Sequence, residues 1–303
     1  MKTRKTILLF LSAVVVLSFL SLFCWCEAHQ PTPASDADLR LAMVSVHSTL
    51  QTPGISSAVV SFTNGTERQY YVLTADHALA QLAREAACFN QSNLVLGVLS
   101  GKDTNSIYKI SKPVDEFKIA NRRDKKYDLV GLDITGGVEF IAANGGLLSS
   151  VNINLSSNAD DVIFSISTNH VISGAGVASS ADFERLGITP GTEIVCYCAH
   201  EINDENRFND DWKSPIIQFH SKIVAINIEV PIANQPNTQL VHVIEGTVEN
   251  GNSGGAVYAL VEIGKKKYPV LIGIISGKIG GTDKSAVVPV DAFVEFARKN
   301  LQK

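Results

Sequence analysis

Cysteine is scarce in this sequence: its 303 residues include five, and Cys24 and Cys26 lie in or beside an apolar N-terminal run. Cys196 and Cys198 are two positions apart, so in a strand they would share a face, where a direct disulfide between them has poor geometry. A bridge from Cys88 to either of them and a set of buried thiols are the alternatives that remain. The sequence therefore excludes a fold held by many disulfides, and its core must come from packing.

An excess of charge of one sign is also lacking. The chain has 26 Lys and Arg against 30 Asp and Glu, a net charge of −4, and removal of residues 1–28 would take away three basic residues and one acidic residue, giving −6. A mildly acidic chain gives no support for nucleic-acid binding. The basic run Lys265–Lys267 lies between two apolar strand-like segments, which is typical of a solvated hairpin turn.

One long hydrophobic run is present, at residues 7–23, after the basic segment Met1–Lys5. Ala28 offers a small residue at a plausible cleavage point, and the whole pattern is typical of a secretory signal peptide. The run is nearly long enough to span a membrane, so an uncleaved N-terminal anchor is the alternative. We expect the rest of the chain to be exported, periplasmic or extracellular, either free or tethered to the membrane by residues 7–23.

Short strand-like segments separated by turns fill most of the chain after a linker at residues 29–40. Residues 55–62 and 69–74 flank the pair Asn64-Gly65, a strong hairpin signal. Residues 78–88 have a helical pattern, and a second helix begins at Asp291. Further strands are expected at 94–99, 107–110, 129–134, 193–198, 216–230, 240–244, 268–276 and 286–290. This pattern predicts an all-β fold, a barrel or a sandwich, with a C-terminal helix.

Three short segments place a histidine, an aspartate and a serine in contexts that suit nucleophilic catalysis. They are Leu73–His77, Tyr127–Val130 and Gly251–Gly255. A serine hydroxyl is a poor nucleophile at neutral pH, so it needs a base, an acid that orients the base, and donors for the oxyanion. Ser253 is the candidate nucleophile, His77 the candidate base and Asp128 the candidate acid. Asp124 and Asp133 are competing acids, but Asp124 lies in a charged run and Asp133 lies further along the strand.

The order of these residues decides among folds that share this chemistry. The glycines around Ser253 also fit the nucleophile elbow of α/β-hydrolases, but that fold has its catalytic histidine after the serine. No histidine follows Ser253 in this chain. An order with aspartate first would need an acid before His77, and the candidates there lie in a polar N-terminal segment or adjoin the histidine itself. The order His, Asp, Ser is the one that remains.

The three segments resemble the signature segments of trypsin- and chymotrypsin-like serine proteases. Asn252 before the serine, together with the few cysteines, is more similar to the bacterial HtrA-like branch. We expect no PDZ domain after the C-terminal helix, although many members of that branch carry one. The resemblance covers residues 40–300 and is weak over 135–240. It implies an all-β fold of two six-stranded antiparallel barrels, at about 41–135 and 136–290, followed by a helix at 291–303.

The resemblance also implies roles for individual residues. Ser253 would attack a peptide carbonyl, His77 would act as base and then acid, and Asp128 would hold the imidazole. The backbone amides of Gly251 and Ser253 would form the oxyanion hole. Asn252 replaces the aspartate that pairs with a freed N-terminus in zymogen-activated members, so we expect activity without that switch.

The same resemblance locates the substrate. Thr247, six residues before the serine, would line the specificity pocket, and the strand Ser276-Gly277-Lys278 would pair with the substrate backbone. Because Thr247 is neutral, we predict a small or medium apolar residue before the cleaved bond. No cofactor and no metal are expected, since a loop site at His200 is a weak candidate. The alternatives to an endopeptidase are a protease-fold binding or chaperone-like protein with a latent cleft and an esterase-like hydrolase.

Overall fold

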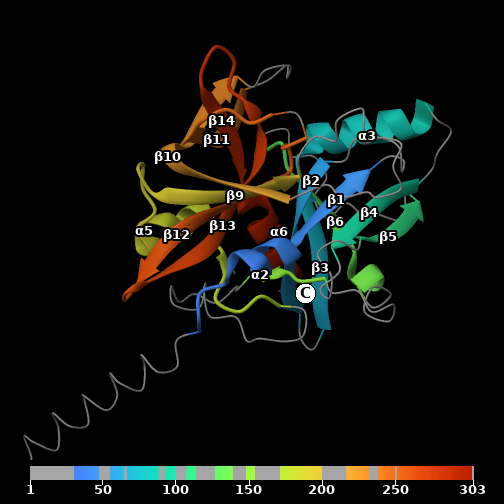
Figure 1. Cartoon of the computed structure of the whole chain (residues 1–303), viewed down its shortest axis with the longest axis horizontal. Helices are drawn as coiled ribbons and strands as arrows, with labels where there is room; N and C mark the ends of the chain where they lie inside the picture. Colours follow the sequence, from blue (N-terminus) through green and yellow to red (C-terminus); the bar gives the residue numbers. More distant parts are fainter. Residues whose placement is uncertain are drawn as a thin grey trace, which may run out of the picture. The chain divides into compact units, whose positions relative to one another are not determined.

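The computed structural model describes most of the chain after residue 30 (Figure 1). The described residues are 31–47, 55–64, 67–88, 93–99, 107–113, 127–138, 148–153, 171–199, 216–231, 238–249 and 251–301. No helix among them is long and apolar enough to cross a membrane. The N-terminal run at 7–23, the acid Asp124 and the loop at His200 lie outside the described residues.

The first sheet has seven strands, six of which follow the order β5-β4-β1-β2-β3-β6. They are β1 (Met43–His47), β2 (Ile55–Asn64), β3 (Glu67–Thr74), β4 (Asn93–Leu99), β5 (Ile107–Pro113) and β6 (Val130–Asp133), and β7 (Val151–Asn152) pairs with β2 in parallel. The predicted hairpin at Asn64 is confirmed, because β2 and β3 pair in antiparallel register with Asn64 opposite Glu67. Between the described residues, β5 and β6 end the path without pairing, so the expected closure of this barrel is not seen.

The second sheet also has seven strands, and six of them form a closed ring of pairings. The order is β12-β9-β10-β11-β14-β13, and β12 also pairs with β13. The strands are β9 (Glu193–Ala199), β10 (Ile216–Pro231), β11 (Thr238–Glu245), β12 (Ala256–Ile263), β13 (Lys266–Lys278) and β14 (Lys284–Pro289), with β8 (Gly176–Val177) parallel to β13. The chain is therefore all-β, with the two mainly antiparallel sheets and the C-terminal helix of a chymotrypsin-like fold.

Two predicted boundaries need correction. The linker expected at 29–40 includes most of a helix, α2 (Asp36–Leu41), which begins at a capping box between Ser35 and Asp38. Its Leu39 is buried in the core, so the folded domain begins before residue 41. The second barrel does not begin at 136, because β7 at Val151 still belongs to the first sheet.

Alternation along the strands explains how each sheet is buried on two faces. In β9, Ile194 and Cys196 belong to the buried cluster enclosed by the second sheet. Val195 and Tyr197 belong to the buried cluster that also contains residues of the first sheet. In β3, Val72 likewise belongs to a cluster within the first sheet. Successive side chains of a strand point to opposite faces, so each strand contributes to two cores.

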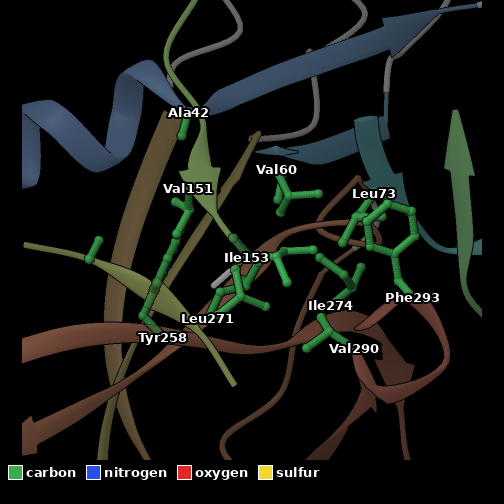
Figure 2. Packing of buried hydrophobic residues seen from close by; sticks show 14 of the residues in the cluster. Ala42, Val60, Leu73, Val151, Ile153, Tyr258, Leu271, Ile274, Val290 and Phe293 are labelled. Atoms are coloured by element: carbon green, nitrogen blue, oxygen red, sulfur yellow. The ribbon is translucent and has the colours of Figure 1, made fainter. Parts of the chain in front are cut away.

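The cluster that contains Tyr197 joins the two sheets (Figure 2). Figure 2 shows Val60 and Leu73 of the first sheet with Tyr258 and Ile274 of the second, and Phe293 of α6 beside them. This helix, α6 (Asp291–Leu301), follows the last strand of the second sheet, yet its Phe293 ring lies 5.1 Å from Tyr71 of β3. The C-terminal helix therefore packs against the first sheet and fixes the two halves together.

Candidate active site

His77 and Asp128 come together because they lie at the same end of two paired strands. β3 ends at Thr74 opposite Val130, the first residue of β6. His77 is the second residue of α3 (Asp76–Cys88), which follows β3 directly, and Asp128 stands two residues before β6. The backbone amide of Asp76 also donates to the carbonyl of Asp128 at 3.3 Å. The strand register thus delivers an acid to the histidine.

Asp128 is a buried acceptor with several donors. Its side chain is 3% exposed, whereas that of His77 is 36% exposed. One carboxylate oxygen accepts from the backbone amide of His77 at 2.8 Å, and the other lies 2.5 Å from Nδ1 of the same histidine. The hydroxyl of Ser276 donates to this second oxygen at 2.7 Å. A buried carboxylate needs such partners, and here they fix both the ring and the carboxylate.

Ser276, a buried residue of β13, links Asp128 to Ser253. Its hydroxyl binds the carboxylate, and its backbone carbonyl accepts a hydrogen bond from the hydroxyl of Ser253 at 2.9 Å. The three residues predicted for catalysis therefore meet around one residue of the second sheet. The hydroxyl of Ser253 donates to this carbonyl in the structure, so transfer of its proton to His77 requires rotation of the hydroxyl away from the carbonyl.

Ser253 lies in a turn between β11 and β12 that is pinned to the neighbouring strand. The amide of Gly254 donates to the carbonyl of Ile275 at 2.8 Å, and the amide of Gly255 donates to the carbonyl of Asn252 at 2.9 Å. Gly251 and Gly254 have φ values of 86° and 88°, which favour glycine. Within the described part of the chain, the turn leaves the amides of Gly251 and Ser253 without a hydrogen bond.

Thr247 and Lys278, both predicted to contact substrate, line one surface cavity of about 630 Å³. The other lining residues are Gly281, Thr282, Asp283 and Lys284. Two of the six lining residues are therefore cationic and one is anionic. Gly277 and Lys278 directly follow Ser276 in β13, so the cavity begins within two residues of the carbonyl that contacts Ser253.

The competing acid Asp133 has a different environment. It is the last residue of β6, and its carboxylate accepts from the amide of Thr135 at 2.9 Å. Across the ladder it stands opposite Tyr71. Burial and the charge of Asp133 raise the pKa of Tyr71 to about 12. Asp128, and not Asp133, is the acid hydrogen-bonded to His77.

Cys196 and Cys198 are free and buried in the interior of the second sheet. Burial raises the pKa of Cys198 to about 12 and raises that of Cys196 well above its ordinary value. Thiolates are the reactive form of cysteine, so neither residue is suited to nucleophilic chemistry. Across the described residues, no group of three or more His, Cys, Asp or Glu side chains is arranged to hold a metal ion.

Sequence reasoning did not find Ser56. This residue of β2 is fully buried, and it donates to the turn that carries Ser253. The contact joins residues 195 positions apart in the chain, and Ser56 lies in no recognised motif. No spacing rule could have connected them.

No protein-family model matches the sequence, and no curated protein matches it. Solved structures with a similar fold include the apo MamO protease domain from Magnetospirillum magneticum, at 14% identity and a TM-score of 0.45, covering 85% of this chain and 96% of that one. Deg5 is similar at 16% identity and a TM-score of 0.46, covering 85% of this chain and 88% of that one. The assignment of the fold depends on the strand pairings described above.

Proposed function

We propose that this protein is a serine endopeptidase that uses His77, Asp128 and Ser253. The observation that carries the proposal is the buried carboxylate of Asp128, which holds His77 through two atoms and reaches Ser253 through Ser276. Incidental polar residues at strand ends would not share partners in this way. The order of the three residues along the chain agrees with the same chemistry.

In the proposed reaction, Ser253 Oγ forms a bond to the carbonyl carbon of the substrate while its proton passes to Nε2 of His77. The peptide C–N bond then breaks, and the imidazolium gives this proton to the leaving amine. Water repeats the sequence: it attacks the acyl carbon, gives a proton to His77, and the proton returns to Ser253 as the acid leaves. Asp128 keeps the ring oriented and stabilises its charged form throughout.

The oxyanion formed in each attack needs donors that have no other partner. The amides of Gly251 and Ser253 meet this condition within the described residues, since the turn uses those of Asn252, Gly254 and Gly255 instead. Each such donor contributes roughly 3 kcal/mol to the stabilisation of the transition state. The two available amides of the turn therefore support the proposed acyl transfer independently of the triad.

The lining of the cavity at Thr247 supports a different substrate preference from the one that Thr247 alone predicts. Lys278 is exposed at its wall and Lys284 is partly exposed, and Asp283 offsets one of the two charges. A neutral Thr247 alone suggested an apolar side chain, but a wall with a net positive charge favours a carboxylate. We therefore propose that the enzyme prefers substrates with Asp or Glu near the cleaved bond.

This preference is tested with a peptide library and the variants Lys278→Glu and Lys284→Glu. We expect cleavage of acidic peptides by the parent, and a decrease of about tenfold in kcat/KM for these peptides in each variant, the equivalent of about 1.4 kcal/mol. Lys222→Glu, at an exposed residue of β10, is the matched control. A parent that prefers apolar side chains would support the interpretation based on Thr247 alone.

One observation favours the latent alternative, a protease-fold binding protein. The hydroxyl of Ser253 donates to the carbonyl of Ser276. A protein whose serine stayed in this position would bind polypeptides without cleaving them. An esterase-like hydrolase would need the same rotation and differs only in the acyl group that it accepts.

The deciding experiment treats residues 29–303 with a fluorophosphonate probe, which reacts only with an activated serine. We expect labelling of the parent and none of Ser253→Ala or His77→Ala. Ser221→Ala, which removes an exposed hydroxyl bonded to the carbonyl of Glu245, is the control and should label fully. A folded parent that does not label would favour the latent binding protein. Labelling followed by cleavage of short esters but not of peptides would favour the esterase.

We also propose that the domain acts outside the cytoplasm, on the basis of the basic segment and apolar run at its N-terminus. Cell fractionation of the full-length protein tests this. Recovery in the periplasm or medium indicates a cleaved signal, recovery in the membrane fraction indicates an anchor, and recovery in the cytoplasm would contradict the proposal.

A further inference from the structure

Ser56 contacts the turn of Ser253 through two separate donors. Its hydroxyl donates to the carbonyl of Gly251 at 2.9 Å, and its backbone amide donates to the carbonyl of Ser253 at 3.2 Å. These two carbonyls lie on either side of Asn252. One residue of the first sheet therefore holds both ends of the segment that contains the candidate nucleophile.

Ser56 is itself held in place. Its backbone carbonyl accepts from the hydroxyl of Thr74 at 2.9 Å, and both residues are fully buried. Thr74 ends β3, three residues before His77. The approach of the turn is close, because a Cβ atom at Gly254 would lie 1.7 Å from the carbonyl oxygen of Ser56. The contacts thus connect the strand that leads to His77 with the turn that carries Ser253.

The hydroxyl of Ser56 has a specific consequence for Gly251. Glycine tolerates several backbone orientations, so Gly251 by itself does not determine where its neighbouring peptide groups face. The carbonyl of Gly251 belongs to the peptide group whose N–H is that of Asn252. A buried donor aimed at this carbonyl fixes the peptide group that lies between the amides of Gly251 and Ser253, and neither amide has another partner among the described residues. A donor that is correctly aligned before the reaction needs no reorganisation when the oxyanion forms.

We propose that Ser56 is a positioning residue that sets the oxyanion donors of this site. It touches neither the substrate nor the reacting atoms, and it acts through the Gly251–Asn252 peptide group and the Ser253 carbonyl, the two points at which it holds the segment that contains both donors. The assignment rests on the proposed function, because it concerns the same site. It predicts a defect confined to the transition state, which a residue that merely stabilises the fold would not produce.

The test is Ser56→Ala, with Ser57→Ala as its matched control. Ser57 is the next residue of β2 and is equally buried, but its hydroxyl has no hydrogen-bond partner in the described structure. The measurements are kcat and KM on a cleaved peptide, and Ki for a peptidyl trifluoromethyl ketone, which forms a tetrahedral oxyanion adduct on an active serine. We expect Ser56→Ala to lower kcat about 10- to 100-fold, to leave KM within about twofold, and to raise Ki by the same factor as it lowers kcat.

Two further variants separate positioning from folding. Ser56→Thr retains a hydroxyl and should recover most of kcat. Ser56→Cys keeps nearly the same volume with only a weak donor, so it should show the loss of kcat expected for alanine. It replaces Ser56→Ala in the test if the alanine variant does not fold. The proposal is overturned if the folded alanine or cysteine variant has kcat and Ki within twofold of Ser57→Ala. A parent that does not react with fluorophosphonate overturns the proposed function and this assignment together, whereas a reactive parent with unaffected Ser56 variants overturns the assignment alone.

Discussion

Acidification should destabilise this protein through a single buried imidazole, His242. This residue of β11 is fully buried, and its Nδ1 accepts from the backbone amide of Asn227 at 3.3 Å. Its ring packs 5.1 Å from that of Phe183, and its Nε2 has no hydrogen-bond partner among the described residues. Burial lowers the pKa of His242 from 6.5 to about 4, because a charged ring at this position would lose its water.

The sign and the size of the effect follow from this shift. Between pH 6.5 and 4 the unfolded chain takes up a proton at His242 that the folded chain does not, so the free energy of unfolding falls as the pH falls. The contribution is fully present above the unfolded pKa and is lost as the pH falls to the folded pKa. Each pKa unit corresponds to about 1.4 kcal/mol, which gives a loss of about 2.5 kcal/mol between pH 7.5 and 4.5.

The assay is urea denaturation of the parent and of His242→Gln at both pH values. Glutamine does not titrate in this range and keeps an acceptor for Asn227, so the variant should lose about 2.5 kcal/mol less stability than the parent on acidification. His220→Gln, at an exposed residue of β10, is the matched control and should retain the pH dependence of the parent. Equal pH dependence in the parent and in His242→Gln would refute the reasoning.

Three further predictions follow from the described contacts. Asp128→Asn should lower kcat about 10⁴-fold, because it removes the acceptor that sets the imidazole tautomer. Asp133→Asn should leave kcat within about tenfold. The opposite result would show that the acid is misassigned. Gly254→Ala should lower the free energy of unfolding, measured in urea, by more than Gly191→Ala. Both glycines have positive φ, but only at Gly254 would a Cβ atom meet backbone atoms. Equal effects would mean that the turn can move away from β2. A thiol reagent should modify Cys198 only after unfolding, because burial raises the pKa of its thiol to about 12; rapid modification of the folded protein would contradict the buried position.

The strands were predictable wherever alternation or a turn signal was strong. The Asn64 hairpin and the C-terminal helix from Asp291 appear as expected. The strand β1 at Met43–His47 carries no such signal, since it is short and directly follows a helix that begins in a polar segment. The ring closure of the second sheet through β12 and β13, and the parallel pairing of β7 with β2, depend on distant partners that no local pattern specifies.

In the candidate site too, some features follow from local sequence patterns and others depend on distant partners. The residue types of the three motifs, and their order, were enough to nominate His77, Asp128 and Ser253 as candidates, and the structure brings His77 and Asp128 into contact. They did not predict that the hydroxyl of Ser276 would bind Asp128, because the resemblance assigned Ser276 only to backbone pairing with substrate. Side-chain hydrogen bonds between residues more than a hundred positions apart depend on the assembled fold.

The position of the site between the two sheets explains why its geometry depends on packing far from the chemistry. His77 and Asp128 are placed by strands of the first sheet, whereas Ser253 and Ser276 are placed by the second. The cluster shown in Figure 2 holds the sheets together, and Phe293 of α6 belongs to it. A displacement of about 1 Å between catalytic groups can reduce the rate about 100-fold. The helix at the end of the chain is therefore as necessary to the proposed chemistry as the strands that carry the reacting groups, although it contributes none of them.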